Sequence, residues 1–467
     1  MKKSAIKKTV LAVVAIGVVV GLGAMAYGLS GTATRDIGPG TGAEAVNLAA
    51  PSAQLIEAGR YLAVTADCIA CHSAKGGKPF AGGLTMATPI GSLYSSNITP
   101  DKETGIGKYS LNDFDRAVRH GITPNGTTLY PAMPYPSYAK ISDGDVRALY
   151  AYFMHGVAPV AQANKASAIS WPLSINWPLA IWRKTYAPEV APIPLNKYQS
   201  ELIGRGAYLV QGLGHCGACH TPRAVTMQEL SQDESHPSFL SGGEVIDGWL
   251  AVNLRANPAG GLGRWSQQDI VDTLAKARNS HSAVMGSPMN EVVAHSSQNM
   301  TTGDQNAIAA YLKSLPVGLA EKGTYAASDV TALALKAGHD EQRGAQLYLD
   351  NCAACHRSDA KSNAIVFPAL AGNPSVLSDN PTSLIRIILA GSELPSTKLA
   401  PSNLGMPAFG WRLSDDETAQ LVTFVRQSWG NQASAATAAD VAKIRKLVDH
   451  ETDQAKKTAS NPTLQAH

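Results

Sequence analysis

The sequence predicts an all-α protein with three tandem units behind an N-terminal leader. One five-residue motif occurs three times, at intervals of 148 and 136 residues, and the same helix signals surround each copy. A chain of 467 residues has room for about three domains. A hydrophobic content of 45% allows each to bury a core. The expected domains are 52–158, 196–316 and 336–431, followed by a polar C-terminal tail at 432–467.

The first 26 residues have the composition of a secretory signal peptide. Four lysines lie within the first eight residues, and an apolar run then ends in Ala24-Met25-Ala26, an A-x-A cleavage site. Extended through Leu29, the run reaches about 20 residues, the length that crosses a bilayer. Residues 1–26 are therefore expected to be a signal peptide or an uncleaved anchor, and in either case the remainder of the chain is exported.

The basic leader also explains the net charge. The formal charge of +3 becomes −1 without the four leader lysines, because the leader contains no acidic residue. The remaining surface therefore has no basic excess of the kind that attracts phosphate backbones. Nucleic acid is not an expected partner.

The repeated motif is Cys-x-x-Cys-His, and its three copies use every cysteine in the chain. They are Cys68, Cys71 and His72; Cys216, Cys219 and His220; and Cys352, Cys355 and His356. This is the signature of covalent c-type haem attachment. On a helix, positions i, i+3 and i+4 share one face, so two thiols can bond to a haem while the imidazole meets its iron. The sequence thus predicts three haem c groups, with the three histidines as axial ligands.

Other roles for the cysteines fit less well. A zinc site needs four tetrahedral ligands, which two motifs would have to share across roughly 140 residues. A thioredoxin-type pair belongs in a βαβ context, which the flanking sequence lacks. Disulfide frameworks are typical of chains too short to build a core.

Helix signals open and close each unit. Gly59, Gly206 and Gly344 each precede a leucine by three residues, shortly before a motif. At the other end, Ser142, Thr301 and Ser414 each precede an acid by three residues, the N-terminal signal of a helix. Apolar residues at i, i+3 and i+4 follow, including the aromatics Tyr152, Tyr311 and Phe424, which we interpret as helix-crossing core. This plan is similar to that of a small class I cytochrome c, whose terminal helices cross beside the haem.

Methionine is the expected sixth ligand, because electron-carrying haems are closed on both sides. Met133, Met289 and Met406 lie in the loop before each closing helix, and each has a proline neighbour that stiffens the loop. Met285 and Met300 are rivals in the second unit. His120 and His281 could instead complete bis-histidine sites, although neither lies in that loop, and His215 is interpreted as a surface or cap residue.

The linker at 159–195 is rich in tryptophan and proline. Trp171, Trp177 and Trp182 lie among apolar residues beside Arg183 and Lys184, and the prolines rule out a long regular helix. The segment is expected either to pack across neighbouring domains or a partner subunit, or to touch lipid headgroups. In the tail, four apolar residues predict one short amphipathic helix: Val441, Ile444, Leu447 and Val448.

Over residues 52–431 the chain resembles the triple-haem cytochrome c subunits of membrane-bound periplasmic dehydrogenases that oxidise alcohols, aldehydes or gluconate. The resemblance rests on Asn97–Asp101, Tyr130–Pro134, Gly261–Ser266 and Leu404–Trp411. It implies that Met133, Met289 and Met406 are the axial methionines. A Pro-Met pair after Gly286 departs slightly from the pattern.

The resemblance also implies a role. Such a subunit takes electrons from a large dehydrogenase subunit carrying a quinone, flavin or molybdenum cofactor, and passes them to ubiquinone at the periplasmic side of the bacterial inner membrane. The chain would then be peripheral or anchored there, with no catalytic residues for substrate oxidation. The alternative is an autonomous multihaem enzyme, such as a peroxidase with one open haem, which would need a distal acid or base near the iron.

Overall fold

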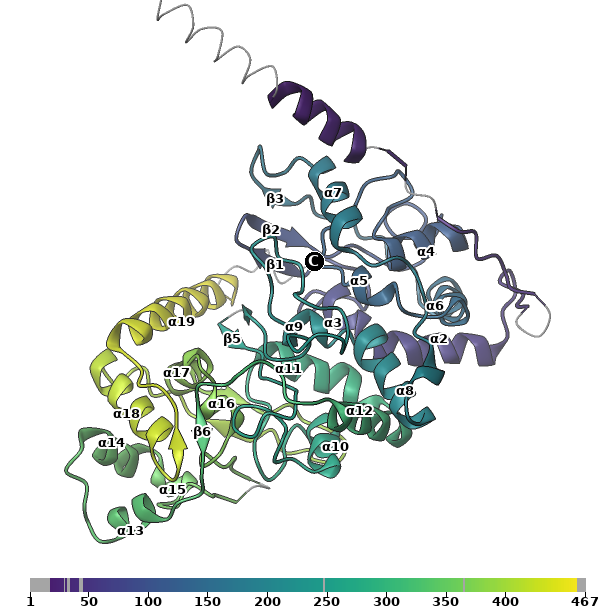
Figure 1. Ribbon diagram of the computed structural model, residues 1–467. Helices are drawn as coiled ribbons and strands as arrows, with labels where there is room; N and C mark the ends of the chain where they lie inside the picture. The colour runs from purple at the N-terminus through teal and green to yellow at the C-terminus, as the bar shows by residue number, and fades with distance from the viewer. Residues whose placement is uncertain are drawn as a thin grey trace, which may run out of the picture. The chain divides into compact units, whose positions relative to one another are not determined.

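The computed structural model describes residues 17–28, 30–31, 34–41, 45–246, 248–363 and 366–459 (Figure 1). The chain divides into two compact units: unit 1 comprises residues 1–62 and 71–193, and unit 2 comprises 63–70 and 194–467. The second and third expected domains therefore fall in one unit, and three separate domains remain a prediction. Residues 1–16 of the expected leader lie outside the described residues, whereas 17–28 form a helix.

The elements of the first repeat lie mostly in unit 1. Its helices are α2 (Ala53–Thr65), α3 (Cys68–His72), α4 (Leu111–His120), α5 (Tyr135–Tyr138), α6 (Asp143–His155) and α7 (Trp177–Tyr186). Strands β1 (Thr85–Thr88), β2 (Gly91–Tyr94) and β3 (Ala168–Ile169) form an antiparallel sheet in that order.

Unit 2 contains the second and third repeats. The second repeat has α8 (Glu201–Tyr208), α9 (Gly217–His220), β4 (Val245–Ile246), β5 (Trp249–Leu250), α10 (Gln267–Lys276), α11 (Ser287–Glu291) and α12 (Thr302–Ser314). Single π-helical turns follow α8 at Leu209–Leu213 and α11 at Val292–Ser296, and short 3-10 turns cover Leu195–Lys197 and Ser297–Asn299. The third has β6 (Thr324–Tyr325), α13 (Val330–Lys336), α14 (Arg343–Asn351), α15 (Ala353–His356), α16 (Pro374–Leu377), α17 (Thr382–Ala390), β7 (Ser392–Glu393), β8 (Gly405–Met406), α18 (Asp415–Gln427), β9 (Asn431–Gln432) and α19 (Ala438–Ala459).

The predicted crossing of the opening and closing helices is confirmed in each repeat: α2 crosses α6, α8 crosses α12, and α14 crosses α18 (Figure 1). The repeated glycine is the point of closest approach. A Cβ atom on Gly59, Gly206 or Gly344 would lie 1.9, 1.9 or 2.6 Å from a backbone carbonyl oxygen of the crossing helix. The same Cβ would also meet the crossing aromatics at their Cβ atoms, at 2.6–2.7 Å: Tyr152, Tyr311 and Phe424 respectively. Only glycine permits this spacing, and the aromatics belong to the crossing as expected.

The predicted helix caps are also confirmed. The side chain of Ser142 accepts a hydrogen bond from Asp145 N, that of Thr301 from Asp304 N, and that of Ser414 from Glu417 N. At Ser414 the backbone N–H also donates a hydrogen bond to the side chain of Glu417, which completes a capping box. These contacts fix where each closing helix begins.

The prediction of an all-α fold needs one correction. The structure is largely helical, but it also contains short antiparallel strands, including the ribbons β4–β5, β6–β9 and β7–β8. Strands of two residues carry too little alternation to be predicted from sequence. They matter because β5 and β8 hold residues of the candidate site.

The C-terminal segment is more than a polar tail. The expected amphipathic helix is present, but as α19 it runs for 22 residues, with Val441 and Ile444 buried in the core of the third repeat. Arg445 also donates to Asp415 Oδ1 at 2.6 Å and to Leu413 O at 2.8 Å. The helix therefore extends the third repeat.

The tryptophan-rich linker divides into a packed part and an exposed part. Trp182, on α7, packs edge to face with Tyr135 at 6.4 Å between ring centroids. Trp171, in the preceding turn, is 80% exposed, and Leu173 beside it is also exposed. Pro178 occupies the first turn of α7, where proline is tolerated. Within the described part of the chain, no helix has both the length and the apolarity needed to cross a membrane.

Candidate haem-binding cavity

The three motif histidines share one geometry. Each ring presents Nδ1 to a backbone carbonyl: His72 to Ser96 O at 2.7 Å, His220 to Val252 O at 2.7 Å, and His356 to Pro368 O at 3.1 Å. A carbonyl oxygen only accepts, so Nδ1 must carry the proton and the lone pair on Nε2 is left for a metal. This orientation is the one that an axial histidine requires.

Burial also sets the charge of these imidazoles. Desolvation lowers the pKa of His72, His220 and His356, and the carbonyl contacts offset this only in part. The neutral ring is therefore favoured near pH 7, and only the neutral ring can ligate iron.

No disulfide bond joins any of the six cysteines, all of which are among the described residues. Burial raises the pKa of Cys216 and of Cys352 to about 12, so the folded chain disfavours the thiolates that zinc binding or thiol redox chemistry would use. Among the described residues, no group of three or more His, Cys, Asp and Glu side chains could hold a metal ion. Thioether bonds to a haem need neither arrangement.

A single apolar cavity of about 390 Å³ in unit 2 is lined by both of its motifs. Cys216, Cys219 and His220 lie on the same cavity as Cys352, Cys355 and His356. Four methionines line it as well: Met285, Met289, Met300 and Met406. The structure thus brings Met289 and Met406 to the cavity, and it also brings both rivals in the second repeat.

In unit 1, Met133 is half-buried in a turn directly before α5, where its amide donates to Tyr130 O at 3.1 Å. Its pairing with His72 remains a prediction. His120, at the end of α4, has Nε2 3.8 Å from Asp115 Oδ2.

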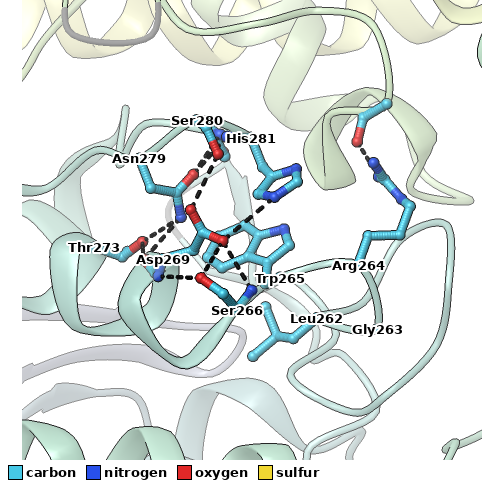
Figure 2. Close-up of polar contacts among 12 residues, drawn as sticks. Leu262, Gly263, Arg264, Trp265, Ser266, Asp269, Thr273, Asn279, Ser280 and His281 are labelled. Atoms are coloured by element: carbon cyan, nitrogen blue, oxygen red, sulfur yellow. Dashed lines mark hydrogen bonds and ion pairs between the residues drawn. The ribbon is translucent and has the colours of Figure 1, made fainter.

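His281 is engaged elsewhere. Figure 2 shows it beside Trp265 and Asp269, and its ring stacks on Trp265 with 5.7 Å between centroids and 11° between planes. Its Nε2 lies 3.5 Å from Asp269 Oδ2, and Asp269 also caps α10 through Ser266. His281 is not among the residues that line the cavity. This position counts against the bis-histidine alternative in the second repeat.

Two tryptophans on the cavity wall, Trp249 and Trp265, have buried indole N–H groups with no acceptor among the described residues. A buried donor with no partner is costly, so such atoms indicate a missing acceptor. Haem carries two carboxylates and an apolar macrocycle. The cysteines outside any disulfide bond, the oriented histidines, the apolar wall and the two buried indole donors together fit that group.

Two further cavity residues were missed from sequence. His215 was interpreted as a surface or cap residue, but it lines the cavity with Nε2 3.4 Å from Ala66 O. Asp67, directly before the first motif, also lines the cavity and is 8% exposed, and burial together with nearby Glu291 raises its pKa to about 8. His215 lines the cavity as the direct neighbour of Cys216, a position that the motif itself indicates, whereas Asp67 reaches the cavity through packing between distant segments.

Known proteins resemble most of the chain. A family model described as cytochrome c matches residues 56–156 and 341–429. The gluconate 2-dehydrogenase cytochrome c subunit of Pantoea cypripedii is 56% identical over 84% of this chain and 90% of its own length. The cytochrome c subunit of a quinone alcohol dehydrogenase from Gluconacetobacter polyoxogenes is 50% identical over 84% of each chain. The fructose dehydrogenase cytochrome subunit of Gluconobacter japonicus is 37% identical over 84% of this chain and 82% of its own.

Proposed function

Because this chain belongs to the family of cytochrome c subunits of dehydrogenase complexes, whose work is electron transfer, we propose that it carries electrons from a catalytic dehydrogenase subunit to ubiquinone through three covalent haems. The observation that carries the proposal is the cavity of unit 2, where two complete motifs and methionines meet on one apolar wall. Haem supplies the reversible one-electron chemistry, and this chain's residues attach it, orient it and exclude water.

The proposed attachment residues are the six motif cysteines: Cys68, Cys71, Cys216, Cys219, Cys352 and Cys355. The proposed axial pairs are His72 with Met133, His220 with Met289, and His356 with Met406. The contact between Nδ1 of each histidine and a backbone carbonyl leaves Nε2 for the iron, and this supports the histidine as one axial ligand. Met289 and Met406 are supported as axial ligands because both line the cavity. The assignment of Met133 depends on its position before α5 and on the resemblance between the repeats.

The substrate belongs to the partner subunit. The names of the relatives specify gluconate, alcohol and fructose, all of which are oxidised at a hydroxyl carbon. We infer a large partner that oxidises an alcohol or aldehyde with a quinone, flavin or molybdenum cofactor. The second candidate function, a multihaem peroxidase with one open iron, is opposed by the candidate methionine ligand that each repeat contains.

The proposed place of work is the periplasmic side of the inner membrane. In unit 1 the leader helix at 17–28 ends against α7, where Lys184 Nζ donates to Ser30 O at 2.7 Å and to Tyr27 O. The exposed Trp171 and Leu173 precede α7. Retention of the leader would anchor the chain, and its cleavage would leave the exposed apolar turn as the peripheral contact.

The test combines mass and optical measurements on the exported full-length chain. Mass spectrometry after denaturation should show three haem additions. The spectrum of the reduced protein should not change with carbon monoxide, because three closed irons offer no free site. Fewer additions would refute the three-haem proposal, and a carbon monoxide complex in the native protein would favour the open-haem enzyme. Isolation from membranes should also recover a dehydrogenase subunit that reduces a ubiquinone analogue only when this chain is present.

A further inference from the structure

Residues of all three repeats line the shared cavity of unit 2. The second and third repeats join where Leu250 N donates to Ser383 Oγ at 2.8 Å, and both residues line the cavity. The first repeat contributes Thr65 and Asp67, because residues 63–70 belong to unit 2. Among the described residues of the lining, Asp67 is the one acid, and none is lysine or arginine. The first repeat therefore brings a single carboxyl group to an apolar wall.

The backbone that carries this carboxyl group is held at the cavity. Asp67 lies in the turn between α2 and α3 with φ of 52°, a left-handed conformation that aspartate tolerates. The two residues before it are bonded to the second repeat: Ser296 Oγ donates to Thr65 O at 3.1 Å, and His215 Nε2 lies 3.4 Å from Ala66 O. The place of Asp67 on the wall is consequently set by contacts on the adjoining backbone.

The residue directly before the first cysteine of each motif lines the cavity in all three repeats: Asp67, His215 and Asn351. Only Asp67 can carry a negative charge there. Burial lowers the pKa of His215, which favours its neutral ring, and the Asn351 amide is uncharged. The third repeat thus holds, at the matching position, the uncharged side chain that has the same shape as aspartic acid.

The surroundings of Asp67 oppose its ionisation. The residue is 8% exposed, and its Oδ1 has no hydrogen-bond partner among the described residues. Burial and the negative charge of Glu291, on α11, together raise the pKa of Asp67 to about 8. Glu291 itself is exposed and lies 3.0 Å from His295 Nε2. A carboxyl group with so little compensation should change its protonation when the charge inside the cavity changes.

We propose that Asp67 is a redox-linked proton site: it takes up one proton from solvent when the haem beside it accepts an electron, and it releases that proton when the haem is oxidised. This inference rests on the haem loading proposed above, and the electron comes from the dehydrogenase subunit. Oxidised haem carries one more positive charge than reduced haem, and that charge favours the Asp67 carboxylate. Coupled uptake of an electron and a proton leaves the net charge of the apolar cavity unchanged.

The proposal fixes the sign of a pH dependence. Below the Asp67 pKa of the oxidised state the acid is protonated throughout, and above the pKa of the reduced state it is ionised throughout. Between the two values, in the region of pH 8, one proton is bound on reduction. There the reduction equilibrium of one haem should fall tenfold for each unit of rising pH, which is about 59 mV for a one-electron couple. Potentiometric titration of the holoprotein at a series of pH values measures this slope.

Asp67→Asn is the direct test, because asparagine keeps the shape of the protonated acid and cannot ionise. The variant should still show three haem additions by mass. Its haem should keep, at every pH, the potential that the parent reaches below the sloping region, so the two proteins should differ only at higher pH. The infrared difference spectrum between reduced and oxidised protein should lose a carboxylic acid C=O band. A merely structural role of Asp67 would produce neither the pH-selective difference nor the loss of the band.

Asp350→Asn is the matched control. Asp350 lies two residues before Cys352, but it is exposed and is not part of the cavity lining. Its replacement should leave the slope and the infrared band as in the parent. Asp67→Glu keeps a carboxyl group and should retain the slope.

A fully loaded Asp67→Asn variant with the parental pH slope would overturn the inference and assign the proton to a haem carboxylate. So would loss of the slope in Asp350→Asn. If Asp67→Asn fails to load, the parent decides, since potentials without a slope or spectra without a redox-linked carboxylic acid band contradict the inference. A parent chain without haem would refute the proposed function itself, and the two failures are therefore distinguishable.

Discussion

The second and third repeats line one cavity, but they differ in the number of methionines that could ligate a haem iron there. Three methionines of the second repeat reach the wall, Met285, Met289 and Met300, whereas Met406 is the one cavity-lining methionine of the third. Met406 is held on β8, where it pairs with Ser392 of β7. Met289 lies on α11, a short helix that runs into a π-helical turn. Proline next to a methionine therefore leaves one candidate ligand in the third repeat, whereas in the second repeat two further methionines reach the same wall.

The largest expected effect is the loss of a whole haem. Replacing Cys352 and Cys355 by alanine should remove one haem addition by mass, and Cys216 with Cys219 should behave alike. Because both motifs line one cavity, either pair should also lower the thermal stability of all of unit 2. Calorimetry measures this effect. If one repeat melts early while the other keeps its parental transition, the two repeats unfold independently and the prediction of a shared loss of stability is wrong.

The next effect tests the methionine choice directly. Met406→Leu should lower one reduction potential by more than about 59 mV, more than tenfold in the reduction equilibrium, because the thioether favours reduced iron. Met289→Leu should do the same to a different haem, while Met285→Leu and Met300→Leu should not. If Met285→Leu or Met300→Leu lowers a potential and Met289→Leu does not, the assignment in the second repeat is wrong.

The second and third repeats also differ in how closely the opening and closing helices approach each other at the repeated glycine. Gly206→Ala would place a methyl 1.9 Å from Ala307 O, whereas Gly344→Ala would place one 2.6 Å from Gln420 O. Overpacking of this kind costs about 1–3 kcal/mol of unfolding free energy, with the larger loss expected at Gly206. Gly303→Ala is the control, since its nearest neighbour would be 3.7 Å away. Denaturant titration measures all three, and equal losses at Gly206 and Gly303 would contradict the steric account.

The smallest effect concerns the caps. Thr301→Ala and Ser414→Ala should each cost about 1 kcal/mol of unfolding free energy, because each leaves a helix-terminal N–H without its acceptor. Serine at position 301 should restore the parental value. A cap variant as stable as the parent would show that water replaces the hydroxyl there.

Much of the architecture could be predicted because its signals are local. The Cys-x-x-Cys-His spacing predicts that the two cysteines and the histidine share one face of a short helix. The pair Ser414 and Glu417, three residues apart, predicts the start of α18. The repeated glycine of each opening helix can be recognised in the sequence. Its steric role is seen only in the structure, where an added Cβ would lie 1.9–2.6 Å from a carbonyl oxygen of the crossing helix.

What could not be predicted depends on packing between distant segments. Leu250 and Ser383 are 133 residues apart, and nothing near either indicates that the two repeats share a cavity wall. The two-residue strand β5 has no periodicity, so the orientation of Trp249 was also invisible. The apolar residues of the C-terminal tail predicted a helix, but not its burial against α17 and α18.

The shared cavity also has a consequence for biogenesis. An apolar wall contributed by both repeats cannot close around one ligand while the other is missing, since half of the lining would then face water. Maturation of unit 2 should therefore be all-or-none, with a chain that has received a single haem there remaining open to proteolysis along both repeats. Maturation would then yield either fully loaded electron carriers or intermediates that proteases can degrade. Limited proteolysis of chains exported under haem limitation, with mass analysis of the surviving fragments, measures this directly.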